Sequence, residues 1–384
     1  MAETFAQKIG QQLANVPAQA TAALIVRLGA IRRNYSQLRA LAKGSETAAV
    51  VKANAYGLGV AQCAPALMKE GCRTFFVATF AEAEALRALS ADATIYVLNG
   101  LLPQNPALYD ELRIRPVLGS PEEAAEWAVY CRSLGRKLPA AIHLDTGMAR
   151  LGLKAHEALL LAKDHSALAS FEPSLIMTHL ACGDDAKSEM NGRQRAQFAE
   201  LSALFPGVPR SLANSAGIFL GPRFHFDVTR PGISLYGGNA QFNAHNPIEP
   251  VVWLFGRIAQ AHWAEAGQTV GYGAMQTLKR RTRIATVCIG YADGYFRAFS
   301  ASDAREGPPG YIGEHRLPLL GRVSMDLITY DATDVPDDLL HRGGWVEVLG
   351  SRVTVDGLAS SGGAIGYEVL TSLSHRYHRI YVDE

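Results

Sequence analysis

The feature of this sequence that most restricts its fold is an alternation of short apolar runs with stretches of helical spacing, from residue 22 to about residue 235. Most of the apolar runs are continuous, which indicates parallel strands covered by helices on both faces. The predicted strands are 22–28, 48–53, 74–79, 94–99, 114–118, 140–145, 174–180, 210–215 and 227–234. Eight or nine such units favour a (β/α)8 TIM barrel over an open doubly wound sheet, since no Gly-x-Gly-x-x-Gly motif opens a helix.

The pattern changes after about residue 250, where apolar and polar residues alternate and turn residues separate the segments. This pattern is typical of a mostly antiparallel β domain. A chain of 384 residues is also long for one domain. The sequence therefore predicts an α/β protein with a barrel domain over residues 1–250 and a β domain over residues 251–384.

The composition is that of an ordinary globular protein, with 48% apolar residues, 19% charged residues and a net charge of +1. Such a balance favours neither a nucleic-acid partner nor a membrane surface. Five scattered cysteines fit reduced thiols, and no basic and apolar leader segment is recognisable, so we expect a cytoplasmic location. Pairs such as His179 with Cys182 lack a third and fourth ligand, and we therefore predict no metal site.

Polar side chains follow five of the predicted strands at the point where each strand ends. These residues are Lys52, His143 with Asp145, Thr178 with His179, Asn214 with Ser215, and Arg230 with Gly232. Any one of them alone is typical of a turn or a helix cap. In a (β/α)8 barrel, however, the carboxyl ends of the strands meet at one rim, where the chemistry of such barrels takes place. Together these residues predict one functional rim.

Lys52 admits two interpretations. A lysine at a strand end usually extends its amine to water. A desolvated amine can instead lose its proton and bind a carbonyl group as a Schiff base. The rim is rich in cations, with Arg150 and Arg230 besides the lysine and with Asp145 as the nearby acid. Such a rim suits an anionic, phosphorylated cofactor and would lower the pKa of Lys52.

The sequence resembles the alanine racemases, which are pyridoxal-phosphate enzymes built from a (β/α)8 barrel and a C-terminal β domain. The resemblance covers nearly the whole chain beyond about residue 20 and rests on motifs in the family's order. The motifs are "AVVKANAYGLG", "LDTGMARLG", "THLA", "LANSAG", "RPGISLYGG", "VGYGA", "IGYADGY", "GRVSMD" and "GYE". The resemblance implies that the strand at about 22–28 pairs with the C-terminal domain, which leaves eight strands for the barrel.

The resemblance implies that Lys52 carries pyridoxal 5'-phosphate. The other cofactor contacts that it implies are Tyr56, His179, Asn214, Ser215, Arg230, Gly232, Ile233 and Tyr367. Arg230 would face the pyridine nitrogen, with His179 hydrogen-bonded to Arg230. An arginine does not give up its proton to that nitrogen, so the ring stays a modest electron sink.

Racemisation needs one base on each face of the substrate. The resemblance assigns one face to Lys52 and the other to Tyr272 of a partner subunit, which implies a homodimer with shared sites. Arg150, Met325 and Asp326 would join Tyr272 in binding the substrate. The corridor by which substrate enters would be lined by Tyr291, Arg297, Arg322, Ile365 and Tyr367.

Three positions differ from the commoner family pattern. Many members carry a lysine where this chain has His143, and that lysine becomes a carbamate that orients the arginine at position 150. A histidine forms no stable carbamate, so we expect Arg150 to be held by neutral His143, by another acceptor or by an anion. "GYG" also replaces "SYG", and "SMD" replaces "CMD".

Three functions are compatible with these observations. The first is racemisation of L- and D-alanine, which supplies D-alanine as a peptidoglycan precursor. The second is racemisation of a broader set of amino acids, such as serine or basic amino acids, on the same fold. The third is a cofactor-carrying protein without activity, which the second domain and Tyr272 disfavour because a carrier needs neither. We expect a small amino acid as the substrate.

Overall fold

The computed structural model describes residues 5–103, 105–241 and 244–384 of the chain. Its chain forms two compact units, each described here by itself. The barrel unit comprises residues 31–248, and the β unit comprises residues 1–30 and 249–384. In the part of the chain that the structure describes, no helix is both long enough and apolar enough to cross a membrane.

The barrel unit is built on parallel strands. Seven of them pair in chain order: β3 (Ala49–Val50), β4 (Thr74–Val77), β5 (Thr94–Val97), β6 (Arg115–Leu118), β7 (Pro139–His143), β8 (Glu172–Met177) and β9 (Arg210–Ser211). Strand β10 (Val228–Thr229) pairs in parallel with β2 (Glu46–Thr47). The ring closes on both sides of β10, since Ala48 N–H donates to the Thr229 carbonyl (2.9 Å) and Arg230 N–H donates to the Ala213 carbonyl (2.8 Å). The predicted (β/α)8 barrel is confirmed.

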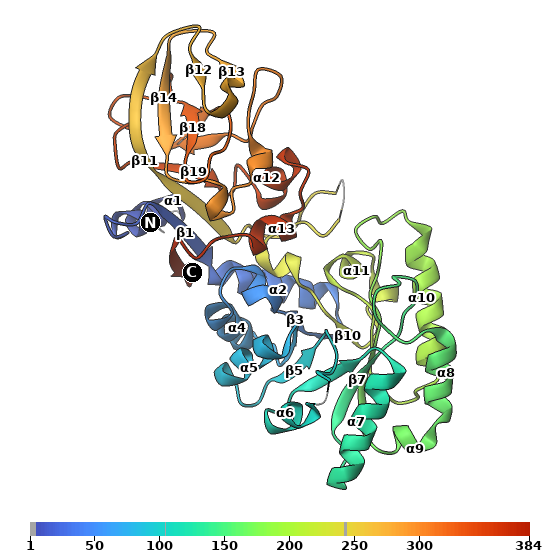
Figure 1. The fold of residues 1–384 in the computed structure, drawn as a ribbon. Coiled ribbons are helices and arrows are strands. Elements are labelled where there is room, and N and C mark those ends of the chain that lie inside the picture. The colour runs from blue at the N-terminus through green and yellow to red at the C-terminus, as the bar shows by residue number, and fades with distance from the viewer. Residues whose placement is uncertain (1–4, 104, 242–243) are drawn as a thin grey trace. The chain divides into compact units, whose positions relative to one another are not determined.

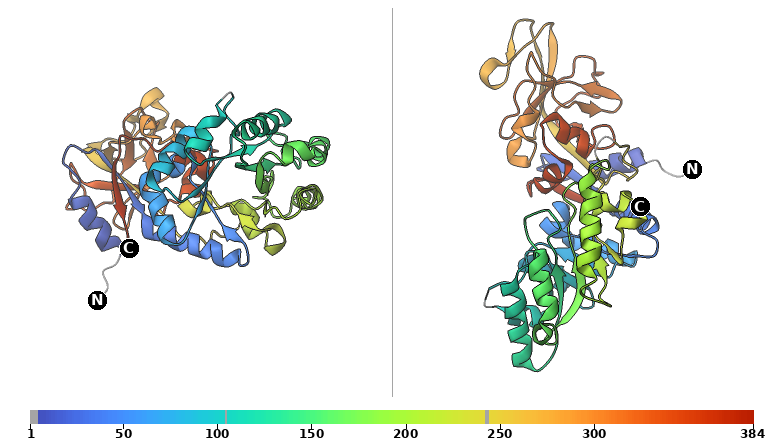
Figure 2. Two further views of the ribbon diagram at one scale, coloured as in Figure 1. Left: turned by 90° about the horizontal axis from the view of Figure 1, so that it is seen from below. Right: turned by 90° about the vertical axis from the view of Figure 1, so that its right-hand side faces the viewer.

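Helices lie outside these strands (Figure 1) and surround them when the molecule is seen from below (Figure 2). They are α2 (Leu28–Leu41), α3 (Lys52–Tyr56), α4 (Val60–Lys69), α5 (Phe80–Leu89), α6 (Pro106–Glu111), α7 (Pro121–Leu134), α8 (Ala155–Lys163), α9 (His165–Leu168), α10 (Glu189–Ser202) and α11 (Ser215–Phe219). Short 3-10 turns follow at η1 (Pro222–Phe224) and η2 (Ile233–Tyr236). The strands are buried on both faces, which explains their continuous apolar runs.

Local sequence signals explain where several helices begin and end. Helix α7 starts after Ser120, whose side chain accepts from the N–H of Glu123, and Pro121 occupies its first turn. It ends at Gly135, which adopts a positive φ of 63°. Helix α5 starts with a reciprocal capping box between Thr79 and Glu82. These signals fix the helix ends and thereby the loops at the strand ends.

The β unit contains a mostly antiparallel sheet with the order β16-β15-β19-β11-β14-β18-β17. Its strands are β11 (Val252–Ala264), β14 (Thr282–Val287), β15 (Gly310–Ile312), β16 (His315–Leu317), β17 (Leu319–Leu320), β18 (Ile328–Asp331) and β19 (Trp345–Leu349). Strand β1 (Ala22–Arg27) joins this sheet, antiparallel to β11 and parallel to β20 (His378–Val382). The first strand of the chain thus belongs to the same unit as the last one.

Shorter elements complete the β unit. A small hairpin pairs β12 (Thr269–Val270) with β13 (Gln276–Thr277), and the turn η3 (Tyr272–Ala274) forms its tip. The remaining elements are η4 (Tyr291–Asp293), η5 (Arg297–Phe299), α12 (Val355–Ser361) and α13 (Gly366–Thr371). The hairpin and the η4 segment carry several of the residues that the family resemblance singles out.

The N-terminal helix α1 (Phe5–Ala14) covers an apolar face of the sheet. Its Ile9 and Leu13 pack against a cluster of Ile25, Trp253 and Phe255. The guanidinium of Arg257 fixes the segment that follows the helix, because its Nε donates to the carbonyl of residue 20 (2.8 Å). Its Nη1 donates to the carbonyl of residue 343 (2.8 Å) and so ties this segment to the turn before β19. The first residues of the chain therefore bury apolar surface that β1 and β11 would otherwise expose.

Candidate active site

Lys52 follows β3 directly and begins a strained turn. The four residues after it, Ala53 to Tyr56, all have φ between 51° and 55°. Residues with a Cβ disfavour this left-handed region by roughly 1–2 kcal/mol each. A run of four persists only where surrounding contacts hold it, and such strain is concentrated at functional sites. The turn thereby points to Lys52 as a functional residue.

Glu82 holds this turn in place. One oxygen of its carboxylate accepts the N–H of Ala53 (2.6 Å), and the other accepts the N–H groups of Ala78 (2.8 Å) and Thr79 (3.2 Å). The end of β4 and the turn after Lys52 are therefore tied to one carboxylate. Sequence reasoning missed Glu82, although the Thr79-x-x-Glu82 spacing of a capping box was a readable signal.

The amine of Lys52 is largely buried near the cationic Arg150. Burial lowers its pKa below the usual range, and the positive charge of Arg150 lowers it further, whereas Glu82 acts in the opposite direction. A lower pKa increases the fraction of uncharged amine, which is the form that attacks a carbonyl carbon. The interpretation of Lys52 as a simple surface lysine is therefore disfavoured.

Arg230 is a buried cation at the centre of the rim. Its Nη2 donates to the Thr178 carbonyl (2.6 Å), its Nη1 donates to Oγ of Ser211, and its guanidinium lies over the Phe76 ring (5.8 Å). Burial lowers its pKa to about 9, so the side chain keeps its proton at neutral pH. Arg230 therefore provides a fixed positive charge. It does not act as an acid that gives its proton to a neighbour.

His179 lies in the same cationic region. Burial lowers the pKa of His179 well below its usual value, and the charge of Arg230 adds to this effect, so the ring is neutral at pH 7. Its Nε2 is 3.5 Å from the Nδ2 of Asn214. Among the described residues, no hydrogen bond joins His179 to Arg230, which differs from our expectation. The guanidinium of Arg230 instead binds Thr178 and Ser211.

His143 ends β7 and is buried. Burial lowers its pKa to about 4, and the charges of Arg230 and Arg150 contribute in the same direction, whereas Asp145 opposes them. The ring is therefore neutral over the physiological range, as the sequence interpretation of this position requires. Among the described residues, no hydrogen bond holds the guanidinium of Arg150, so neither His143 nor another acceptor of the chain, two of the three supports that we expected, binds it.

The loop that leads to Arg150 is itself well fixed. Oδ1 of Asp145 accepts the N–H groups of three successive residues, Gly147 (2.9 Å), Met148 (3.0 Å) and Ala149 (3.1 Å). This arrangement uses the acid of the rim to fold the backbone. The loop thus presents Arg150 from a rigid support.

A polar cradle lies beside Lys52 within the barrel unit. Oγ of Ser215 accepts the N–H groups of Gly232 (2.8 Å) and Ser234 (3.4 Å). A Cβ at position 232 would lie 2.2 Å from the hydroxyl of Tyr56, so only glycine allows the phenol to approach the backbone there. Ile233 begins the 3-10 turn that follows. Hydroxyls and backbone N–H groups in such a cradle suit phosphate oxygens.

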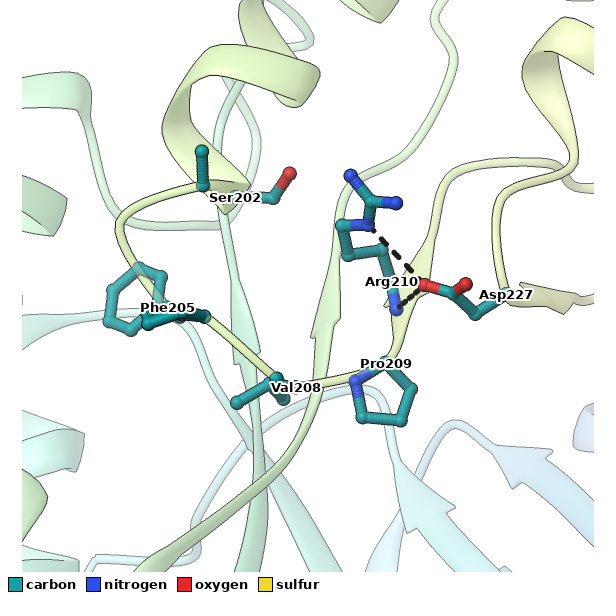
Figure 3. Close-up of a pocket in the computed structure, with 9 residues that line it drawn as sticks. Ser202, Phe205, Val208, Pro209, Arg210 and Asp227 are labelled. Atoms are coloured by element: carbon teal, nitrogen blue, oxygen red, sulfur yellow. Dashed lines mark hydrogen bonds and ion pairs between the residues drawn. The ribbon is translucent and has the colours of Figure 1, made fainter.

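A separate hollow of about 420 Å³ lies at the opposite end of the strands, before β9 and β10 (Figure 3). Arg210 and Asp227 in its wall bind each other, since Oδ2 of Asp227 accepts Nε–H (3.3 Å) and backbone N–H (2.8 Å) of Arg210. The amino end of a barrel contributes to stability and not to chemistry. We therefore locate the site at the rim of Lys52.

Within the β unit, two segments that the resemblance singles out lie together. The carbonyl of Met325 accepts the N–H of Ala292 (3.0 Å), which joins the "SMD" and "GYADGY" segments. Arg376 then bridges Asp326 (2.9 Å) and the buried Asp293 (3.2 Å). Sequence reasoning missed this bridging arginine, for which the sequence holds no local signal.

The hairpin that carries Tyr272 also contacts corridor residues. A Cβ at Gly273 would lie 2.9 Å from Nη1 of Arg322, and Arg322 and Arg297 line one hollow of about 340 Å³. Tyr272 is 71% exposed, so it does not pack within its own chain. Other large apolar side chains of the β unit are exposed as well: Met275, Tyr291, Met325, Leu327, Ile365 and Tyr367.

The site residues that sequence analysis predicted are divided between the two units. The barrel unit holds Lys52, Tyr56, Arg150, His179, Asn214, Ser215, Arg230, Gly232 and Ile233. The β unit holds Tyr272, Tyr291, Arg297, Arg322, Met325, Asp326, Ile365 and Tyr367. A reactive lysine beside an anion cradle and a buried cation, at the carboxyl rim of a barrel, is typical of enzymes that bind a phosphorylated carbonyl compound.

Comparisons with known proteins place the chain in one family. Its residues 26–240 match the family "Alanine racemase, N-terminal domain", and its residues 251–381 match "Alanine racemase, C-terminal domain". The chain belongs to the alanine racemase family.

Its relatives cover nearly the whole chain. The alanine racemase of Methylobacterium nodulans is 48% identical, over 94% of this chain and 96% of that protein. The alanine racemase of Rhizobium meliloti is 46% identical, over 94% and 97%. The crystal structure of alanine racemase from Bartonella henselae with covalently bound pyridoxal phosphate has a TM-score of 0.89 at 40% identity, over 94% of this chain and 100% of that one.

Removal of the carboxylate of Glu82 should destabilise the turn after Lys52. We expect Glu82→Ala to lower the free energy of unfolding by about 2 kcal/mol, because three N–H groups lose a charged acceptor. Urea unfolding measures this loss. Glu84→Ala is the matched control, since Glu84 is exposed on the same helix. Equal stabilities of the two variants would contradict the assigned role.

The lowered pKa of His143 predicts an acid-sensitive fold. Between about pH 6.5 and pH 4 the unfolded chain binds a proton that folded His143 does not, so the free energy of unfolding falls as the pH falls. In His143→Asn this slope should decrease by up to about 1.4 kcal/mol per pH unit. His179 is present in the wild type and in the variant, so the difference between their slopes reports on His143. Identical slopes in urea unfolding at several pH values would show that His143 titrates normally.

Proposed function

We propose that this protein interconverts L- and D-alanine with pyridoxal 5'-phosphate bound covalently to Lys52. The observation that carries the proposal is the amine of Lys52, whose pKa burial and Arg150 lower, next to the cradle of Tyr56, Ser215 and Gly232. Membership of the family over both domains supports the reaction, as does the covalently bound cofactor of the Bartonella henselae relative.

The residues of the rim fit the cofactor. The cradle of Tyr56, Ser215, Gly232 and Ile233 would hold the phosphate, and the family resemblance adds Tyr367 to the phosphate contacts. Asn214 and His179 would lie beside the cofactor, with His179 neutral. Pyridoxal phosphate, when bound, withdraws electrons from Cα of the amino acid and so makes the α-proton acidic. These residues orient it and keep its anionic end fixed.

Arg230 and Arg150 would act on opposite ends of the reacting centre. Arg230 would face the pyridine nitrogen and, because it keeps its proton at neutral pH, would donate a hydrogen bond without transferring a proton. Arg150 would bind the carboxylate of the substrate, with help from the backbone N–H of Met325 and from Asp326. A fixed carboxylate leaves Cα with one face toward each base.

Two bases would exchange the α-proton. The amine of Lys52 would remove or return it on one face, and the phenol of Tyr272 on the other. The 71% exposure of Tyr272 supports this role, because the side chain extends away from its own chain. Tyr291, Arg297, Arg322 and Ile365 would line the corridor by which substrate arrives.

We further propose a homodimer in which Tyr272 and Met325 of one subunit complete the site of the other. The exposure of Tyr272 and of other large apolar side chains of the β unit supports this assembly, since exposed apolar surface marks protein interfaces. The barrel domain would end at residue 250 and the β domain begin at 251. The reaction on a free amino acid and the scattered cysteines are consistent with a cytoplasmic enzyme.

Lys52→Ala should abolish covalent binding of the cofactor. After treatment with pyridoxal phosphate and borohydride, we expect the peptide that contains Lys52 to gain the mass of the reduced cofactor in the wild type and not in the variant. Intact folding of the variant is checked by circular dichroism. A variant that still carries the cofactor covalently would contradict the assignment of Lys52.

Tyr272→Ala should show which base acts on which face of the substrate. Racemisation is lost equally in both directions because the enantiomers have the same free energy. The enantiomer whose α-proton faces Lys52 should still exchange that proton with deuterated water. For the other enantiomer, whose α-proton faces position 272, the exchange rate should fall by about 10²–10⁴-fold. Small and equal losses of exchange would make Tyr272 a packing residue.

Mixing Lys52→Ala with Tyr272→Ala tests whether the site is shared between subunits. A mixed dimer has one site with both residues intact if Tyr272 acts on its partner, so about a quarter of the wild-type activity should return after subunit exchange. If Tyr272 acts within its own chain, every site lacks one base and the mixture stays inactive. Sedimentation analysis establishes the oligomeric state of each protein.

A further inference from the structure

Gln194 is a fully buried side chain of α10 that neither the sequence motifs nor the proposed chemistry use. Its amide makes three hydrogen bonds. Nε2 donates to the carbonyl of His179 (2.9 Å) and to Oγ1 of Thr146 (3.2 Å), and Oε1 accepts the N–H of Ala181 (2.8 Å). A buried amide whose donor and acceptor are both satisfied fixes its partners strongly, because a buried polar group that loses a hydrogen bond is not compensated by water.

The partners of Gln194 belong to two loops of the rim. Thr146 is part of the loop from Asp145 to Arg150, whereas residues 179–181 follow the end of β8. Oγ1 of Thr146 also lies 2.8 Å from Oγ1 of Thr178, and both side chains are buried. The carbonyl of Thr178 is the one that accepts from Arg230 (2.6 Å). A continuous set of hydrogen bonds therefore leads from α10 to the buried cation.

Helix α10 also supports the Arg150 loop by close packing. Gly147 has a φ of 120°, and a Cβ at this position would lie 2.5 Å from Cε of Met190, one turn before Gln194 on the same helix. The loop backbone thus lies directly against α10. Its far side is folded onto Oδ1 of Asp145, while the guanidinium of Arg150 has no hydrogen bond among the described residues.

We propose that Gln194 is the positioning residue that orients the Arg150 loop and joins it to Arg230 through Thr146 and Thr178. It acts on the backbone of the loop, so Arg150 is aligned by its support and not by a partner of its guanidinium. A chain with His143 in place of a carbamylated lysine needs such a support. Only the kinetic consequence of this inference, the change in kcat/KM, rests on the proposed function.

The test compares Gln194→Leu with Gln197→Leu. Gln197 is exposed on the same helix and serves as the matched control. In Gln194→Leu we expect hydrogen exchange in the peptide covering residues 145–150 to be about tenfold faster, whereas exchange in the barrel strands is unchanged. The value of kcat/KM for L-alanine should fall about 10²-fold, mostly through KM, because a displaced arginine loses the substrate carboxylate.

A second pair of variants distinguishes the loss of this hydrogen bond from a general loss of packing. Thr146→Val removes the hydroxyl at constant shape, and we expect it to accelerate exchange in the same peptide. Thr146→Ser keeps the hydroxyl and should preserve the wild-type protection there. Exchange that is unchanged in Gln194→Leu, or accelerated equally throughout the barrel in Gln194→Leu and both Thr146 variants, would overturn the proposal.

The kinetic measurement and the hydrogen-exchange measurement can contradict the two proposals separately. A wild-type protein that does not racemise alanine contradicts the proposed function, whereas the exchange measurement on the protein as purified still tests the support of the loop. A Gln194→Leu variant with faster loop exchange but wild-type KM would show that the loop is not the element that aligns the substrate. That result would overturn the proposal and leave the proposed function intact.

Discussion

The rest of the candidate site depends on the burial of the guanidinium of Arg230. Its hydrogen bonds to Thr178 and Ser211 join the ends of β8 and β9 to the segment after β10. Burial is the main cause that lowers the pKa of His143 and of His179, and the charge of Arg230 lowers both further. One buried cation thus joins the strand ends of the rim and helps to keep the neighbouring histidines neutral.

Concentrating positive charge in a buried region costs free energy, and the fold compensates for this in two ways. The histidines lose their protons instead of adding to the charge. The acids Asp145 and Glu82 are used to hold backbone N–H groups, so they fix the turns at Arg150 and Lys52 and only partly offset the cations. The rim is left attractive to anions, which is the property that the proposed phosphorylated cofactor and carboxylate substrate require.

Much of this arrangement could be predicted from the sequence, because strand periodicity places Lys52 and Arg230 at the same edge of a parallel barrel. Alternation of apolar and polar residues likewise predicted the antiparallel sheet. The missing parts depend on contacts between distant segments. Gln194 looks like any polar helix residue until two loops meet at its amide. The guanidinium of Arg230 binds Thr178 and Ser211, where a bond to His179 was expected. Periodicity carries no information on such choices between competing partners.

The left-handed run from Ala53 to Tyr56 has a consequence for how the reactive amine comes into being. An isolated peptide with this sequence would relax to right-handed or extended backbone, since the contacts that hold the strained turn include the carboxylate of Glu82, about thirty residues later in the chain. The direction of the Lys52 side chain is therefore acquired late, when the second β/α unit docks beside the first. In a newly made chain, residue 52 is thus an ordinary lysine until this second unit has docked.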